Sequence, residues 1–303
     1  MKPTDRAYGP VVVLVGDQEG RYPDGNALLV RGQDHHLLID ASLTVHARGH
    51  DLPGRVDRVL LSHVHEDHIP GLHHFRDVPV LVHHEDFPAL ASMEGLLGAY
   101  GYDEIAASWA LELRDDFHVS FRPDAVTYRN GAVWDLGGGV TVTALHLPGH
   151  TAGHCGFLIE PGGFFYLADI ELSGFGPFYG DATSDLARFE ASLARCREVE
   201  ARWYATFHHK GIIEGQDNFR RELDAFTAVI ARRDDAIVEV LGERPHTLDE
   251  LATHRFLYRP HVDLPFVFYV ERRSIEQHLA KLMAQGRVEQ CEPGRYRRLG
   301  CTG

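Results

Sequence analysis

Four potential metal ligands lie within six residues of this sequence: His63, His65, Asp67 and His68. They follow an apolar run, 56–62, which is rich in β-branched residues and typical of a strand. Residues i and i+2 of an extended chain point to the same side, so His63 and His65 can close on one ion. The bend that follows can turn Asp67 and His68 toward a second ion. Imidazole ligands suit zinc or iron, and a carboxylate beside them makes manganese a compatible ion as well.

Three later segments also place such a side chain just after an apolar run. The runs are 140–145, 164–168 and 203–207, and they lead to His150, Asp169 and the pair His208-His209. Strand ends that share a rim of two packed sheets would bring all of them to one site. The chain has 21 histidines, and the pairs at 35–36, 73–74 and 83–84 are interpreted as surface or packed residues.

This ordered set of motifs resembles the metallo-β-lactamase superfamily, in the branch of glyoxalase II and related thioesterases, lactonases and RNA-processing enzymes. The resemblance covers roughly residues 10–215. It implies that His63, His65 and His150 hold one metal ion, that Asp67, His68 and one of His208/His209 hold the other, and that Asp169 bridges both. The implied fold is an α/β protein, an αββα sandwich.

Three further residues receive roles from the same resemblance. His209 is preferred over His208 as the last ligand. In the family, the closing histidine is typically followed by two small or bent positions and then by apolar ones, and residues 210–213 match this pattern better when it starts after His209. His154 is expected to donate or accept hydrogen bonds beside the metals rather than to bind one. Asp40 either supports the metal loop as a hydrogen-bonding partner or starts a turn.

The resemblance implies a hydrolase that uses a hydroxide on a dinuclear metal centre to cleave a small ester, thioester or lactone. Its cofactors would be two divalent ions, zinc first, with iron or manganese compatible. Asp67 would position a group or accept a proton, and Glu66 would be solvated or support the ligands. The first alternative is an RNA or phosphodiester hydrolase. A flavodiiron reductase would need a carboxylate where this chain has His65 and a flavin domain that the remaining length cannot hold. A non-catalytic scaffold is disfavoured because every ligand position is filled.

Charge and composition limit the classes of molecule that this protein is expected to bind. The chain has 303 residues and a net charge of −14. From residue 244 onward, ten Lys/Arg stand against seven Asp/Glu, while the preceding part has twenty against thirty-seven. This acidic part argues against nucleic acid as a partner. A small-molecule substrate is expected, without a membrane span, and a homo-oligomer is compatible with the sequence.

The location is expected to be cytoplasmic, because the apolar run 11–15 is too short for a secretory signal. Cys155, Cys196, Cys291 and Cys301 form no Cys-x-x-Cys pair, and reduced thiols are expected.

The remaining pattern predicts two domains. A catalytic domain is expected over 1–240, with substrate specificity in the loops 85–120 and 172–183. Asn130-Gly131 between two short β-type runs predicts a hairpin. A winged-helix-like domain is expected over 241–303, with a capping box at 247–250, an amphipathic helix ending at Gly286 and a final hairpin. Its aromatic segment 264–269 is predicted to pack on the catalytic domain or on a second subunit.

Overall fold

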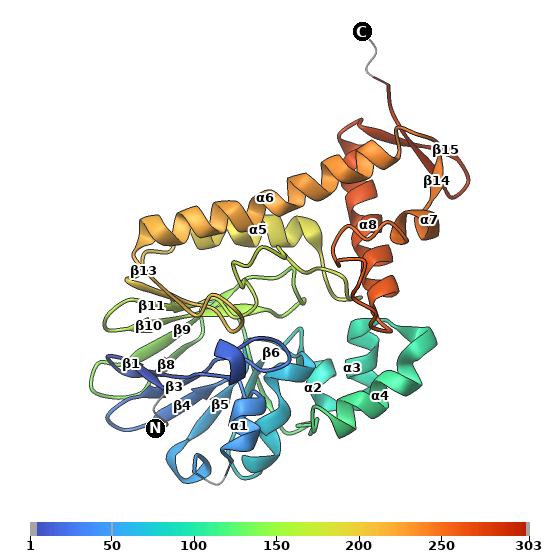
Figure 1. Cartoon of the computed structure of the whole chain (residues 1–303). Coiled ribbons are helices and arrows are strands. Elements are labelled where there is room, and N and C mark those ends of the chain that lie inside the picture. The colour runs from blue at the N-terminus through green and yellow to red at the C-terminus, as the bar shows by residue number, and fades with distance from the viewer. Residues whose placement is uncertain (1–4, 50, 301–303) are drawn as a thin grey trace.

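The computed structural model describes residues 5–49 and 51–300. Two β-sheets lie face to face in the body of the molecule, and helices cover both outer faces (Figure 1). The first sheet has the order β1 (Arg6–Tyr8), β2 (Val11–Leu14), β3 (Ala27–Arg31), β4 (His36–Ile39), β5 (Arg58–Leu60), β6 (Val80–His83), β7 (Val126–Tyr128). Strands β1 to β4 pair antiparallel, and β4 to β7 pair parallel.

The second sheet has the order β13 (Ile212–Glu214), β12 (Trp203–Ala205), β11 (Phe164–Tyr166), β10 (Cys155–Glu160), β9 (Thr141–His146), β8 (Val133–Asp135). Only β11 and β12 pair parallel within it.

The period of two along each strand builds the layers. Val11 and Val13 on β2 point into the core between the sheets, where they join Phe157 of β10. The alternate residues Val12 and Leu14 pack on the opposite face with the helices. Each such buried side chain contributes about 1.5–3 kcal/mol to folding.

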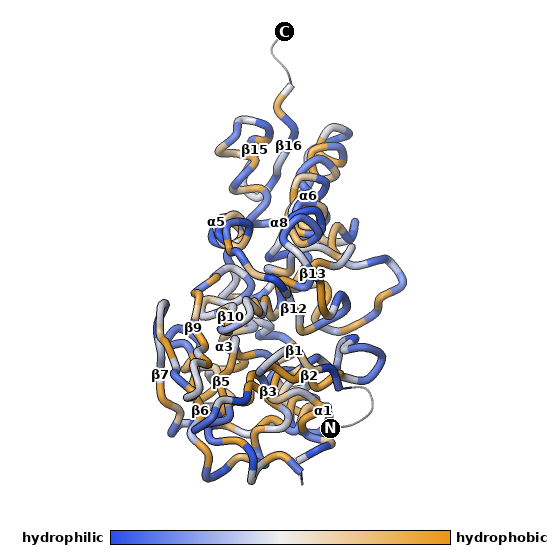
Figure 2. Tube along the Cα trace, turned by 90° about the vertical axis from the view of Figure 1, so that its left-hand side faces the viewer, coloured by the Kyte–Doolittle hydropathy of each residue, from blue (hydrophilic) through white to orange (hydrophobic). Residues whose placement is uncertain are grey.

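Helices form the two outer layers. The first sheet is covered by α1 (Leu43–Ala47), α2 (Phe87–Ala91), α3 (Met93–Tyr100) and α4 (Ala106–Asp115), and the second by α5 (Leu186–Arg197) and α6 (Gln216–Val240). Along α6, hydrophilic and hydrophobic colours alternate (Figure 2), as expected of a helix that buries one face. The predicted αββα sandwich is confirmed.

The prediction of a hairpin at Asn130-Gly131 is wrong. The turn exists, with Gly131 at φ +80°, but β7 before it pairs with β6 of the first sheet, whereas β8 after it pairs with β9 of the second. The turn therefore carries the chain from one sheet to the other. Its local sequence fixes the reversal but not the pairing partners, which are chosen by long-range packing.

The C-terminal part forms its own small core with the end of α6. It consists of β14 (His246–Thr247), α7 (Leu248–Ala252), α8 (Val267–Ala284), β15 (Val288–Glu292) and β16 (Arg295–Arg298), with strand order β14-β16-β15. The capping box of Thr247 and Glu250 is present. Because Ile237 and Val238 of α6 belong to this core, the helix joins both parts. The winged-helix assignment and the boundary at 240/241 stay predictions.

The aromatic segment 264–269, which includes the first residues of α8, packs on the region of α3 and α4, below it in Figure 1. The Phe266 ring centroid lies 5.4 Å from that of Trp109 and 6.2 Å from that of Tyr102. The expected contact of this segment with the body of the same chain is thus observed.

Two smaller expectations concern thiols and the membrane. Cys155, Cys196 and Cys291 are free thiols, and Cys301 lies outside the described residues. In the part of the chain that the structure describes, every helix is too short or too polar to cross a membrane.

Candidate metal centre

The predicted ligands converge where strands of both sheets end. His63 and His65 follow β5, His150 lies between β9 and β10, and Asp169 follows β11. Main-chain hydrogen bonds join these loops: the Cys155 N–H donates to the Ser62 carbonyl, and the Ala41 N–H donates to the His68 carbonyl. Residues distant in sequence are therefore held by backbone contacts rather than by the side chains alone.

Gly149 lets the β9–β10 loop approach α5 closely. Its φ is +134°, and a Cβ atom there would lie 2.3 Å from the Cα of Phe189. Glycine alone fits this place without displacing the helix. The Ser184 hydroxyl then donates to the His150 carbonyl at 2.6 Å, which fixes the next residue of the loop.

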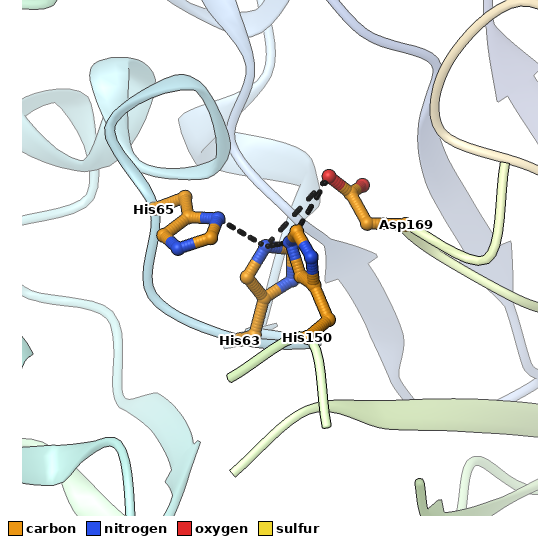
Figure 3. Close-up of side chains that lie close together, drawn as sticks. All are labelled: His63, His65, His150 and Asp169. Carbon is orange, nitrogen blue, oxygen red and sulfur yellow. Dashed lines mark hydrogen bonds and ion pairs between the residues drawn. The ribbon is translucent and has the colours of Figure 1, made fainter. Parts of the chain in front are cut away.

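The first group consists of His63, His65, His150 and Asp169, all buried (Figure 3). The Nε2 atom of His63 lies 3.2 Å from His65 Nδ1 and 3.2 Å from His150 Nε2. His150 Nε2 is also 3.4 Å from Asp169 Oδ2. These rings point toward one another, and the carboxylate closes the group from another strand end.

The second group consists of Asp67, His68 and His208, also buried. His208 Nε2 lies 2.8 Å from Asp67 Oδ2, and His68 Nε2 lies 3.9 Å from Asp67 Oδ1. Asp169 connects the two groups, because its Oδ1 lies 3.1 Å from His68 Nε2 while its Oδ2 faces His150. The carboxylate thus has the position that the sequence assigned to a bridge.

These separations fit divalent metal ions. Two ligand atoms about 2.0–2.2 Å from a tetrahedral ion lie about 3.3 Å apart, close to the spacing of the ring nitrogens here. Among the described residues, Asp67 and Asp169 form ion pairs only with histidines. Neither buried carboxylate has a lysine or arginine partner there. Buried negative charge of this kind needs a positive partner, which protonated histidines or a bound cation can supply.

The second nitrogen of each candidate histidine has a polar partner. It forms a hydrogen bond with the Ser62 hydroxyl for His63, the Phe178 carbonyl for His150 and the Gly20 carbonyl for His208. It forms an ion pair with Asp181 for His65 and with Asp40 for His68. Such partners fix the ring orientation and leave the other nitrogen directed at the group, as in metal-binding histidines generally.

Asp40 supports the metal loop, which is one of the two roles predicted for it. Its carboxylate accepts from the Ser62 N–H and hydroxyl at 2.8 Å each and from the Tyr166 hydroxyl at 2.8 Å, and it lies 3.0 Å from His68 Nδ1. His154 has the predicted hydrogen-bonding role: its Nδ1–H donates to the Leu147 carbonyl, and its Nε2 accepts from the Asp169 N–H.

The electrostatic environment favours positive charge at three of the rings, those of His65, His68 and His208. Burial lowers the pKa of His65, but the hydrogen bond and charge of Asp181 outweigh it and raise the pKa to about 9. For His208, burial is likewise outweighed by Asp169 and Asp67, and the pKa rises to about 10. A field that retains a proton on these rings also attracts a bound cation.

The structure places His208, rather than the preferred His209, beside the other candidate ligands. The ring of His209 is 40% exposed and faces Glu171, with 3.6 Å between Nε2 and Oε2, whereas His208 occupies the second group. The reason is local: Phe207 stacks on His68 in the core, His208 follows into the site, and His209 at φ +55° turns the chain outward.

Glu66 is buried rather than solvated, between two tyrosines. Its carboxylate accepts from the hydroxyls of Tyr22 and Tyr100. Asp181 was not anticipated at all from the sequence. It pairs with His65 at 2.9 Å and accepts from the Tyr102 hydroxyl, yet it comes from a loop more than a hundred residues after His65. No motif around it signals this contact.

A cavity of about 1050 Å³ opens above the two groups. Asp67, His150 and Asp169 lie in its wall, together with the loop that contains Phe175 and Phe178. Residues of α6 and of the segment 254–266 also line it, and the sequence had not linked them to the site. Such a volume is typical of small-molecule sites.

Comparison with known proteins agrees with this fold. A metallo-beta-lactamase family protein from Thermus thermophilus is 23% identical, with a TM-score of 0.73 over 96% of this chain and 99% of that one. A beta-lactamase domain protein from Burkholderia ambifaria is 19% identical, with a TM-score of 0.70 over 97% and 93%. An archaeal metallo-beta-lactamase superfamily protein from Sulfolobus tokodaii is 17% identical, with a TM-score of 0.50 over 92% and 100%.

These likenesses show the fold. No curated protein matches the sequence significantly, and membership of the glyoxalase II branch stays a prediction. The model of the metallo-beta-lactamase superfamily matches residues 21–221, two thirds of the chain, and the chain therefore belongs to this superfamily.

Proposed function

We propose that this protein is a hydrolase dependent on two divalent metal ions and that it cleaves a small ester, thioester or lactone. The observation that carries the proposal is the pair of histidine and aspartate groups joined by Asp169 in the wall of a cavity. His63, His65 and His150 would hold one ion, and Asp67, His68 and His208 the other, with Asp169 contacting both. When bound, two such ions supply an activated water and polarise a scissile carbonyl.

The chain itself prepares the ligands and a proton acceptor. The fixed second nitrogens keep the rings oriented before an ion arrives, which lowers the ordering entropy of binding. Asp67 lies in the cavity wall with one oxygen 2.8 Å from His208 and the other 3.9 Å from His68. A carboxylate in this place can orient an attacking water and accept its proton.

The cavity supports a small substrate. Its walls combine aromatic side chains, among them Tyr22, Phe178 and Tyr258, with polar groups near the floor. Apolar walls that exclude water, and a few polar groups that orient the ligand, are usual in sites for small molecules. Zinc is the first choice of metal, because nitrogen ligands outnumber carboxylates in both groups.

A substrate screen with matched variants tests the proposal. The zinc-reconstituted protein should hydrolyse members of a panel of aryl esters, acyl thioesters and lactones. Asp169→Ala should lose this activity and metal content, while Asp249→Ala on the exposed surface of α7 should keep both. Turnover confined to phosphodiesters would favour the phosphodiesterase alternative, and wild-type turnover by Asp169→Ala would refute the assigned centre.

A further inference from the structure

A second group of histidines lies apart from the candidate centre. This group consists of His46 of α1 and of His73 and His74 at the end of the short helix η4 (Pro70–His74), and one ring nitrogen from each lies within 4.8 Å of the other two. These three residues, here called the outer histidine cluster, are half-buried. His118 stacks on His46, with 4.1 Å between ring centroids and 11° between planes. The sequence alone had suggested only surface or packed histidines at 73–74.

Hydrogen bonds fix two of the three rings. The Nδ1–H of His73 donates to the Pro70 carbonyl at 2.9 Å, and the Nε2–H of His74 donates to the His46 carbonyl at 2.9 Å. In a neutral ring that donates one N–H, the other nitrogen carries a lone pair. Donation to a backbone carbonyl is a usual means of orienting a metal-binding histidine.

One ring nitrogen of His46 is unsatisfied. Its Nδ1 is buried and has no hydrogen-bonding partner in the described part of the chain. Burial, together with the neighbouring rings, holds the pKa of His46 and of His73 below the usual value. The neutral rings of His46 and His73 present lone pairs rather than positive charges, and Nδ1 of His46 lacks a partner in the described part of the chain.

The backbone leaves room for this arrangement. A Cβ atom at Gly49 would lie 2.0 Å from Nε2 of His74, so a side chain there would displace the ring. His118 reaches its stacking position with a φ of +52°, a conformation that few non-glycine residues adopt. Both features favour the close approach of rings at this surface.

We propose that the outer histidine cluster binds a transition-metal dication of the zinc class, separately from the candidate centre. Three neutral imidazoles and a water would complete a tetrahedral zinc site. Ligand nitrogens at a tetrahedral zinc lie about 3.3 Å apart, so modest rotation of the rings brings them from their present spacing into coordination. Harder ions such as Mg²⁺ and Ca²⁺ prefer oxygen ligands, and the cluster offers none from side chains.

The ion would support the loop that holds the candidate centre. The elements α1 and η4 flank this loop, since α1 begins three residues after Asp40 and η4 begins two residues after His68. They are already linked, because the Ala41 N–H donates to the His68 carbonyl and the Gly71 N–H donates to the Ala41 carbonyl. An ion joining His46 to His73 would strengthen the same connection from outside.

Zinc stoichiometry tests the proposal. Metal-free protein is titrated with zinc against a chromophoric chelator, and the ions retained after desalting are counted by elemental analysis. His73→Asn should bind one zinc equivalent fewer than the wild type. His35→Asn, which changes an exposed histidine paired with Asp57, should bind as many as the wild type. Equal stoichiometry in the wild type and His73→Asn would overturn the proposal.

A second variant keeps all three histidines. Gly49→Ala should weaken the same zinc equivalent about tenfold or more by displacing His74. Zinc binding to the native state should also raise the melting temperature of the wild type by more than that of His73→Asn. Identical zinc-induced shifts in the two proteins would contradict the site, and matching melting temperatures without metal establish that both are folded.

Discussion

At the scale of single residues, the candidate centre depends as much on the partners of its histidines as on the histidines. Asp40 is the clearest case, because one buried carboxylate contacts Ser62, His68 and Tyr166. Its φ of +60° is tolerated by asparagine as well as by aspartate. The charge can therefore be removed without a forced change of backbone.

We predict that Asp40→Asn binds zinc about 10–100-fold more weakly than the wild type, since the neutral amide no longer polarises His68. Chelator competition measures the affinity. Tyr166→Phe removes one hydrogen bond to the same carboxylate while keeping its charge, so its loss should be clearly smaller. Equal affinities for the wild type and Asp40→Asn would show that Asp40 only shapes a turn.

The two adjacent histidines give a matched pair. His208→Ala should lower metal content, because its Nε2 lies 2.8 Å from Asp67, and His209→Ala should change it little, because its ring is 40% exposed beside Glu171. Elemental analysis after zinc reconstitution distinguishes them. Metal loss in His209→Ala alone would return the ligand role to His209.

These residues also show how far the sequence reaches. The spacing of His63, His65, Asp67 and His68 predicts a cluster because neighbours on one short loop must lie together. It cannot distinguish His208 from His209, since the choice depends on a single backbone turn at φ +55°. Asp181 escapes sequence analysis because its contact with His65 exists only once distant loops have packed.

At the scale of elements, strand alternation predicts the layers, but partner choice is a property of the whole fold. The runs around Asn130-Gly131 resemble a hairpin and yet join different sheets. Contacts between the sheets also place polar residues together. His83 at the end of β6 stacks on His146 at the end of β9, with 4.1 Å between ring centroids.

This stacked pair predicts a pH dependence of stability. Burial, then the charges of His146 and other neighbours, lowers the pKa of His83 to about 3, below the usual 6.5. The unfolded chain therefore binds more protons between these values, so His83 contributes stability above about pH 6.5 that is lost as the pH falls toward 3. Urea unfolding at pH 7 and pH 5 should show a smaller decrease for His83→Gln than for the wild type. The same decrease in both proteins would contradict this account.

At the scale of the whole molecule, the C-terminal part is a wall of the cavity as well as an appended unit. Residues of the segment 254–266 line the same cavity as the candidate centre, and Glu271 of α8 holds part of this segment in place. Its buried carboxylate accepts from the N–H groups of Phe256, Leu257 and Tyr258. The sequence placed specificity only in the loops 85–120 and 172–183, because nothing in the tail's own pattern indicates that it folds back over the site.

If this wall selects the substrate, changing it should alter binding without disturbing the metal ions. The ring of Tyr258 lies against Phe175, with 5.2 Å between centroids and an angle of 62°, and it lines the cavity without joining either ligand group. We predict that Tyr258→Ala keeps the zinc content of the wild type. It should raise KM several-fold for any ester or thioester that the protein hydrolyses, because contact with the substrate is lost. The effect on kcat should be smaller, because the reacting groups stay in place. Steady-state kinetics with elemental analysis measures both quantities. Tyr296→Ala, on β16 within the C-terminal sheet, is the matched control and should leave KM unchanged. Unaltered KM in Tyr258→Ala would show that this side chain has no part in substrate binding, and a parallel loss of zinc would show that it supports the metal ions instead.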